Sequence, residues 1–301
     1  MKAFITGASG FVGPHLVEAL REDGWHSVAF AGDVRDESAL RASLASAKPD
    51  VVFHLAALSF VPDSLHSPEE TYAVNVAGTA HVASALRAHA KDVGKTPRLL
   101  FTSSAEVYGA RAPSELPMRE TLAPAPRNPY AASKAAGEAI LLAEMRAFGG
   151  DVVVARAFNH IGPGQSERFA VASFALGLAR IAAGETSVLL VGNLDAERDV
   201  LDVRDVVRAY VALAKDGERG EIYNVCSGKA VAVRDLLKEL VAIARVPVEI
   251  RTDPERLRPS EIAISVGSNA KLVERTGWQP RVRLVDSLRD IYESARKRLA
   301  S

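Results

Sequence analysis

Three glycines near the N-terminus constrain the fold of this chain more than any other feature. They lie in Gly7-Ala8-Ser9-Gly10-Phe11-Val12-Gly13, between an apolar run over 2–6 and a helical pattern over 11–21. In such a turn, glycines permit a tight bend, close approach of the backbone to a pyrophosphate, and close helix–strand packing. The alternative is a tight connection without a ligand. The turn predicts a dinucleotide at the helix N-terminus, contacted by Gly7, Ser9, Gly10, Phe11, Val12 and Gly13.

The first half of the 301-residue chain alternates apolar runs with longer helical patterns. We expect strands over 2–6, 28–30, 51–55, 99–102 and 152–155, and helices over 11–21, 37–47, 69–90 and 130–148. This alternation predicts an α/β fold with a doubly wound parallel sheet, covered by helices on both faces.

The pattern loosens after residue 157. Helices are expected over 171–183, 205–215, 233–244 and 284–299, and strands over 221–225 and 246–251. We expect a dinucleotide-binding domain of residues 1–159 plus about 201–224. Residues 160–200 and 225–301 would form a smaller C-terminal α/β domain that binds the substrate.

The charge balance gives no sign of a nucleic-acid or membrane partner, because 37 Lys and Arg match 37 Asp and Glu. No apolar run reaches the roughly 18 residues of a membrane span. The N-terminus runs into glycine too soon for a signal peptide. Because the one cysteine, Cys226, cannot form an internal disulfide, we expect a cytoplasmic protein. We expect no metal site.

Tyr130 and Lys134 are four residues apart in a predicted helix, so their side chains should share one face. A nearby ammonium favours phenolate, so we expect Lys134 to lower the pKa of Tyr130 from its usual value of about 10. Such a tyrosine can exchange a proton with a carbonyl or an alcohol. The alternative is an exposed pair without chemistry.

The Gly-x-x-Gly-x-x-Gly spacing, combined with the Tyr130–Lys134 spacing, resembles the short-chain dehydrogenase/reductase superfamily. Chain length and the C-terminal half resemble its extended branch, the NAD-dependent epimerase/dehydratase family, which acts on nucleotide sugars. The resemblance implies a Rossmann-type sheet. Residues 53–57, 75–79 and 101–109 match further family segments. They imply Ser104 as the catalytic hydroxyl, and cofactor contacts from Leu55, Ala56, Ala57, Asn75, Thr102, Tyr130, Lys134 and Phe158.

The choice between NAD and NADP stays open in the sequence. Gly32-Asp33-Val34 resembles the segment with the family's adenine-contacting aspartate, which implies cofactor contacts from Asp33 and Val34. Arg35 could meet a 2′-phosphate. Asp33 is equally typical of a capping or turn residue.

Residues 156–165, 191–199, 223–228 and 257–261 resemble GDP-4-keto-6-deoxy-D-mannose reductases and the neighbouring GDP-mannose 4,6-dehydratases. The resemblance implies that Asn159, Arg198 and Arg258 approach the diphosphate of a GDP-sugar and that Glu261 approaches the nucleotide ribose. Guanidinium groups bind phosphate in a bidentate fork. The other expected substrate contacts are Ser59, Ser104, Glu106, Gln165 and Arg168.

The resemblance implies reduction of the 4-keto group of GDP-4-keto-6-deoxy-D-mannose to GDP-D-rhamnose by NAD(P)H. Tyr130 would protonate the sugar oxygen, Ser104 would orient it, and Lys134 would hold the nicotinamide ribose. Glu106 stands where similar 4,6-dehydratases have a catalytic base, but they carry aspartate or serine where this chain has Ala105.

Three other functions stay open: a GDP-mannose 4,6-dehydratase, a nucleotide-sugar 4-epimerase and a non-catalytic NAD(P)-sensing regulator. The helices over 69–90 and 130–148 resemble those of the family's dimer interface, which implies a homodimer. Their apolar residues, such as Leu141, Leu142 and Met145, could instead cover the sheet.

Overall fold

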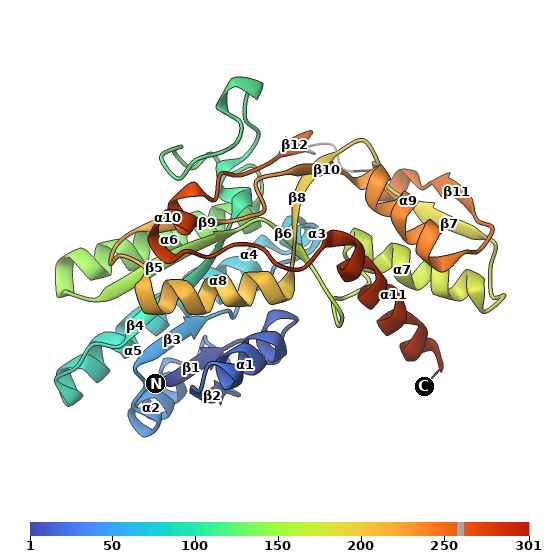
Figure 1. Cartoon of the computed structure of the whole chain (residues 1–301). Coiled ribbons are helices and arrows are strands. Elements are labelled where there is room, and N and C mark those ends of the chain that lie inside the picture. Colours follow the sequence, from blue (N-terminus) through green and yellow to red (C-terminus); the bar gives the residue numbers. More distant parts are fainter. Residues whose placement is uncertain (258–261, 301) are drawn as a thin grey trace.

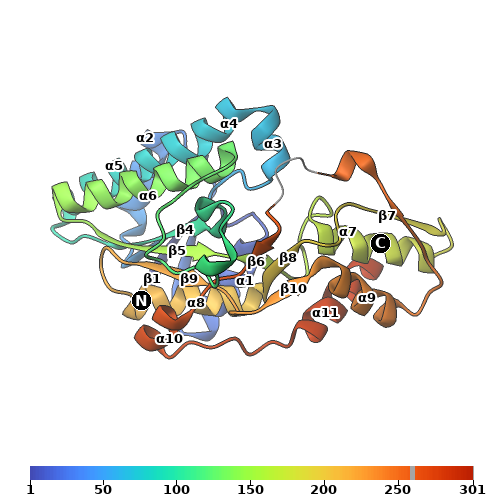
Figure 2. The ribbon, with the colours of Figure 1, turned by 90° about the horizontal axis from the view of Figure 1, so that it is seen from above.

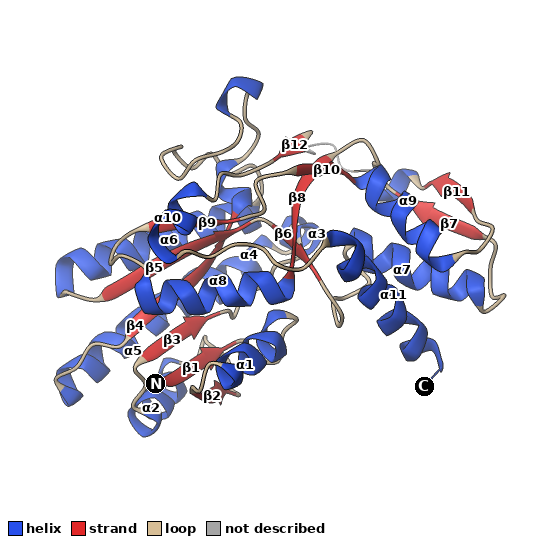
Figure 3. Ribbon diagram, in the orientation of Figure 1, coloured by secondary structure: helices blue, strands red, loops and turns tan. Residues whose placement is uncertain are grey.

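The structure is a computed structural model that describes residues 1–257 and 262–300. Its larger sheet has six parallel strands in the order β2-β1-β3-β4-β5-β9 (Figures 1 and 3). The predicted parallel arrangement is therefore confirmed. The strands are β1 (Lys2–Thr6), β2 (His26–Phe30), β3 (Val51–His54), β4 (Arg98–Ser104), β5 (Asp151–Ala157) and β9 (Ile222–Val225).

Helices cover both faces of this sheet (Figure 2). One face packs against α1 (Val12–Glu22) and α8 (Val203–Asp216). The other packs against α2 (Glu37–Ala47), α5 (Gly78–Val93) and α6 (Pro129–Phe148). All four residues of β3 are buried, as expected for a parallel strand covered on both sides.

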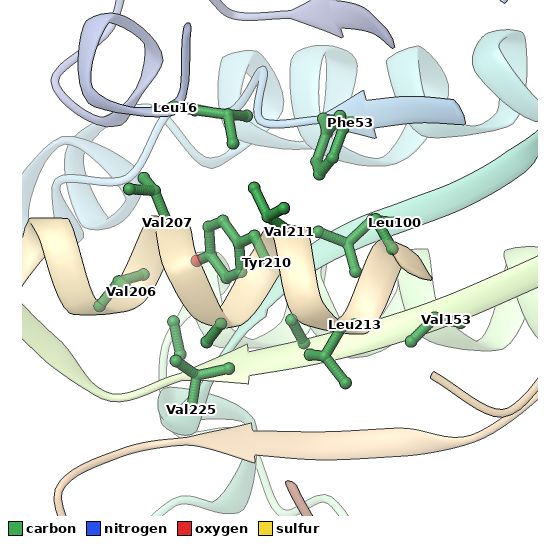
Figure 4. Close-up of a cluster of buried hydrophobic side chains, with 14 of the residues drawn as sticks. Leu16, Phe53, Leu100, Val153, Val206, Val207, Tyr210, Val211, Leu213 and Val225 are labelled. Carbon is green, nitrogen blue, oxygen red and sulfur yellow. The ribbon is translucent and has the colours of Figure 1, made fainter. Parts of the chain in front are cut away.

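The core under α8 shows how the first face is closed (Figure 4). Leu16 of α1, Phe53 of β3 and Leu100 of β4 are fully buried, and they share one cluster with Val207 and Tyr210 of α8. Burial of apolar surface stabilises a fold by about 25 cal/mol per Å². Helix α8 therefore belongs to the core of the larger sheet, and β9 completes that sheet by pairing with β5.

A smaller α/β part has its own apolar core (Figure 1). Strand β8 (Glu197–Asp202) pairs with β6 (Asn159–Ile161) and β12 (Ile264–Ser265) in parallel and with β10 (Ala230–Ala232) in antiparallel. Strands β7 (Val188–Val191) and β11 (Glu249–Thr252) form a separate pair. The helices around this core are α7 (Ala170–Ala182), α9 (Val233–Ala244) and α11 (Leu284–Ala300).

A π-helical segment, Ala73–Ala77, interrupts the single helix predicted over 69–90 and separates α4 (Pro68–Tyr72) from α5. That prediction of one regular helix is wrong. In the π segment, the Asn75 amide accepts a bond from Leu58 N (2.8 Å) and donates to Leu58 O (3.0 Å) and Ser133 Oγ (2.9 Å). The local change of helical pitch lets Asn75 tie the loop after β3 to α6.

The sequence did not predict strands β6, β7, β8, β10 and β12, or the short helices α3 (Val61–His66) and α10 (Ala270–Thr276). Strand β8 reads Glu-Arg-Asp-Val-Leu-Asp, which has no strand-like alternation of apolar residues. Its Asp199 is nevertheless fully buried, because the carboxylate accepts bonds from Ser227 N (2.7 Å) and Gly228 N (2.9 Å). Buried hydrogen bonds thus replace apolar patterning here.

None of the helices in the described ranges is both long and apolar enough to cross a membrane.

Because Leu100 lies in the buried cluster of Figure 4, we expect its truncation to destabilise the protein strongly. Leu100→Ala should lower the free energy of unfolding by about 2–5 kcal/mol, because it removes transfer energy and leaves a cavity. Leu65→Ala, at a side chain that is 57% exposed, should change it by less than about 0.5 kcal/mol. Urea unfolding followed by circular dichroism measures both, and equal losses would contradict this core.

Candidate active site

Ser104 is the last residue of β4 and caps the short helix that follows it. Its Oγ accepts a hydrogen bond from Glu106 N at 3.2 Å, and its hydroxyl lies close enough to the phenol of Tyr130 to lower the pKa of that phenol. Ser104 is buried, at 7% exposure. The structure therefore brings together the hydroxyl and the phenol that the sequence predicted as partners.

Helix α6 places Tyr130 because its start is well defined. Asn128 is the N-cap, with its side chain accepting from Ala131 N at 2.7 Å, and Pro129 occupies the first helical position. Tyr130 and Lys134 both lie on the buried face of α6, so the predicted shared face is confirmed. Lys134 Nζ donates to the carbonyl oxygen of Thr102 at 2.7 Å.

Burial, rather than Lys134, dominates the acidity of Tyr130. It raises the pKa of Tyr130 to about 12. The nearby Ser104 hydroxyl opposes this rise, and the Glu106 carboxylate adds to it. Burial also lowers the pKa of Lys134 to about 8. The prediction that Lys134 lowers the Tyr130 pKa is therefore wrong in this structure. A protonated phenol at neutral pH is suited to donating a proton.

Glu106 lies close enough to Tyr130 to affect its pKa. Its Oε2 accepts a bond from Asn128 Nδ2 at 3.1 Å. A half-buried carboxylate beside the phenol can accept a proton from a bound molecule. Within residues 1–257 and 262–300, no cluster of three His, Cys, Asp or Glu side chains could hold a metal ion.

The glycine turn has backbone positions that no side chain could occupy. Gly7 has a φ of +72°, and an added Cβ would lie 2.5 Å from Ala56 N. A Cβ on Gly13 would lie 2.0 Å from Ala8 O. The turn therefore passes tightly against the segment after β3 and leads into the N-terminus of α1, whose first N–H groups have no partners within the helix. These features fit a dinucleotide pyrophosphate.

The ends of β1, β3 and β4 bring the predicted site together. These strands are neighbours in the sheet, and they lead into the glycine turn, into Leu55–Ala57 and into the segment beginning at Ser104. Leu55 N donates to Thr6 O at 3.1 Å, which holds the second segment beside the first. In open α/β sheets, ligands bind at the carboxyl ends of the strands.

Asp33 and Arg35 lie in the exposed loop after β2 and form an ion pair, with Arg35 Nη2 2.6 Å from Asp33 Oδ2. Arg35 also contacts Glu70 at 3.0 Å. Bonds from Arg35 lower the pKa of Asp33. The Asp33 carboxylate and the Arg35 guanidinium, which the sequence predicted as groups that contact the cofactor, thus both lie in this loop. They form an ion pair with each other.

Several predicted cofactor residues have structural contacts. Val34 is buried against Gly78 of α5. Thr102 Oγ1 donates to His54 O at 2.9 Å. The side chain of Phe158 is buried in an apolar cluster that includes Tyr108 and contains no residue of the glycine turn. Phe11 of that turn instead stacks on His160 at 6.0 Å between ring centroids.

The chain leaves the larger sheet at the end of β5, next to Ser104, and enters the smaller part with β6. Ser104 pairs with Ala157 in the register of β4 and β5. Asn159, two residues later and exposed, begins β6. The topology alone therefore brings this predicted substrate residue near the catalytic group.

The other predicted substrate residues are more scattered. Ser59 is exposed in the loop after β3. Arg168 pairs with Asp63 and lies 4.0 Å over the ring of Phe60, so it joins the smaller part to α3. Gln165 donates to His160 O at 2.9 Å and lines a small cavity next to α7 and α11.

Arg198 lies in β8 and donates to Glu197 O at 2.9 Å. Arg258 and Glu261 lie outside the described residues.

The sequence reasoning missed Glu138 and Arg156, which form a buried ion pair next to Lys134. A signal for Glu138 was available, because it follows Lys134 by four residues and so extends the face of Tyr130 and Lys134. Arg156 had no such signal, since its partner lies on another element.

Comparisons with known proteins agree with this arrangement. A family model described as GDP-mannose 4,6 dehydratase matches residues 26–291. The GDP-6-deoxy-D-mannose reductase of Pseudomonas aeruginosa is 41% identical, over 99% of this chain and 98% of that protein.

Two solved structures extend the likeness. The structure of RMD from Pseudomonas aeruginosa complexed with NADPH has a TM-score of 0.92 and 40% identity, covering 99% of both chains. The UDP-glucose 4-epimerase of Thermus thermophilus complexed with NAD has a TM-score of 0.87 and 28% identity, covering 98% of this chain and 99% of that one. The chain therefore belongs to the GDP-mannose 4,6 dehydratase family, within the extended short-chain dehydrogenases/reductases.

Proposed function

We propose that this protein reduces the 4-keto group of GDP-4-keto-6-deoxy-D-mannose to the hydroxyl group of GDP-D-rhamnose, which is GDP-6-deoxy-D-mannose. The observation that carries the proposal is the buried pair of Ser104, at the end of β4, and Tyr130, at the start of α6, with Lys134 one helical turn away. The full-length likeness to a GDP-6-deoxy-D-mannose reductase supports the choice of sugar.

In this proposal each residue of the pair acts on the keto oxygen. Ser104 donates a hydrogen bond that orients the oxygen, and Tyr130 transfers its proton to that oxygen as negative charge develops. NAD(P)H, when bound, supplies the hydride equivalent for sugar C4. Lys134 contacts the nicotinamide ribose and, as an ammonium, stabilises the phenolate left on Tyr130.

The division of labour between the two parts of the chain belongs to the same proposal. The glycine turn, Leu55–Ala57 and Asp33 would hold the dinucleotide, and the smaller part, with Asn159 and Arg198, would hold the GDP moiety. Arg258 and Glu261 would complete that contact. We also propose a cytoplasmic location, in keeping with the free thiol of Cys226.

A GDP-mannose 4,6-dehydratase is the second candidate, because Glu106 lies beside Tyr130 as a base for the sugar C5 proton would. Ala105 counts against it. The two functions differ in their use of the cofactor. With GDP-mannose alone, a dehydratase would form a keto sugar without added NAD(P)H. The proposed reductase should leave GDP-mannose unchanged and oxidise NAD(P)H only with the 4-keto-6-deoxy sugar.

Replacing Tyr130 tests the proton donor. Tyr130→Phe should lower kcat by at least about 100-fold, because general acid catalysis contributes about 10²–10⁴-fold, while NADPH binding measured by fluorescence stays intact. Tyr72→Phe removes a phenol from an exposed side chain of α4 and should leave kcat unchanged. Normal turnover by Tyr130→Phe would remove Tyr130 from this role.

The loop after β2 predicts the basis of cofactor choice. If Arg35 contacts a 2′-phosphate, Arg35→Ala should raise the KM for NADPH roughly tenfold, because hydrogen bonds to charged groups contribute about 1.5–3 kcal/mol, and should change the KM for NADH little. Arg41→Ala, at an exposed arginine of α2 paired with Glu37, is the matched control. Equal effects of Arg35→Ala on both cofactors would refute this assignment.

We also propose a homodimer through α4, α5 and α6. Leu141 is buried on the sheet, so it cannot contribute; the exposed Tyr72 and Phe148 can. Light scattering at micromolar protein should give twice the 32.1 kDa chain mass, and Tyr72→Glu should shift it toward one chain because it would bury an unpaired charge. A single-chain mass for the unaltered protein would contradict the dimer.

A further inference from the structure

Three side chains of α6 lie against Thr102, Ser103 and Ser104, the last three residues of β4. Tyr130 lies close enough to Ser104 for that hydroxyl to affect its pKa, and Lys134 Nζ donates to Thr102 O at 2.7 Å. Glu138, one further turn along α6, accepts a bond from Ser103 Oγ at 2.5 Å. The first two contacts belong to the proposed reaction. The third has no role in it so far.

The carboxylate of Glu138 is fully engaged by an arginine from β5. Arg156 Nε donates to Glu138 Oε1 at 2.9 Å, and Arg156 Nη2 donates to Oε2 at 2.7 Å. Both side chains are almost completely buried, at 4% and 2% exposure. The Arg156 guanidinium also lies 4.6 Å over the ring of Tyr108. These contacts hold the carboxylate in one position.

A buried ion pair contributes little net stability compared with apolar side chains of similar size, because both charges lose their hydration. Stability alone therefore does not explain why this pair lies one turn from Lys134. Burial of Lys134 favours its neutral form, and the carboxylate of Glu138 opposes that effect and raises the Lys134 pKa.

Among the residues that the structure describes, no other group around Lys134 supplies a compensating negative charge. His54 from β3 is fully buried, with its pKa lowered to about 3, so its imidazole is neutral. Tyr130 is a neutral phenol, and burial also raises the pKa of Tyr210 in α8. Glu106 acts on Tyr130, and Arg156 is engaged by Glu138. On β4, Lys134 meets Thr102 O and lies 5.0 Å from the ring of Phe101.

We propose that Glu138, held in place by Arg156, is a positioning residue that keeps Lys134 as an ammonium directed at the end of β4. This inference rests on the proposed reduction, in which that ammonium holds the cofactor ribose and stabilises the phenolate. It assigns the buried pair an electrostatic role in the reaction in addition to its part in packing α6 on the sheet.

The test compares Glu138→Gln/Arg156→Gln with Glu138→Asp. The double variant removes both charges, so no unpaired ion stays buried, whereas Glu138→Gln alone would strand Arg156 and could unfold the protein. The two readouts are the pH profile of kcat/KM and the titration of Lys134 followed by NMR of protein labelled with [ε-¹³C]lysine. The Lys134 signal is assigned by its loss in Lys134→Arg.

In the unaltered enzyme, kcat/KM should fall as the pH rises above about 8, where Lys134 loses its proton. In the double variant, the fall of kcat/KM at high pH and the Lys134 titration seen by NMR should both move to lower pH by about one unit. Glu138→Asp keeps the negative charge and should shift both by less. A folded double variant with an unshifted Lys134 titration would overturn the proposal. If the unaltered protein does not reduce the 4-keto sugar, the proposed function fails, and the NMR titration still decides the role of Glu138.

Discussion

The close packing of α6 against β4 is the contact on which the candidate site depends. Gly137 permits it, since a Cβ there would lie 2.7 Å from the ring of Phe101. This approach buries the side chains of Tyr130, Lys134 and Glu138, which follow one another along one face of α6. A larger residue at 137 would lift the helix and separate the phenol from Ser104.

Burial then sets the protonation states from which chemistry starts. It favours the neutral phenol of Tyr130 and weakens the hold of Lys134 on its proton. A neutral phenol is the acid that reduction of a ketone requires. The ammonium of Lys134 is needed after the proton has left, and the buried carboxylate of Glu138 is the group that helps to retain it.

Much of this arrangement could be predicted from local patterns. The bounds predicted for β1, α2 and α9 agree with the structure, because β1 is a short apolar run and the two helices have apolar residues at helical spacing. The glycine turn and the Tyr130–Lys134 face were also found from motif spacing, and Ser104 was implied by the family resemblance. Features that depend on partners distant in sequence were not predicted. Arg156 pairs with a residue of another element, and the π-helical segment around Asn75 is accompanied by contacts of Asn75 with Leu58 and Ser133. The pKa of Tyr130 was predicted with the wrong sign, because helical spacing says nothing about desolvation.

The central claim is that the phenol of Tyr130 and a reduced nicotinamide act on one sugar carbonyl. Deuterium transfer tests it most directly: the protein is supplied with GDP-4-keto-6-deoxy-D-mannose and NADPH carrying deuterium at the transferable nicotinamide position, and the product is analysed by NMR. The account predicts GDP-D-rhamnose with deuterium at C4 of the sugar. A product without deuterium at C4, or one formed without consumption of NADPH, would contradict it.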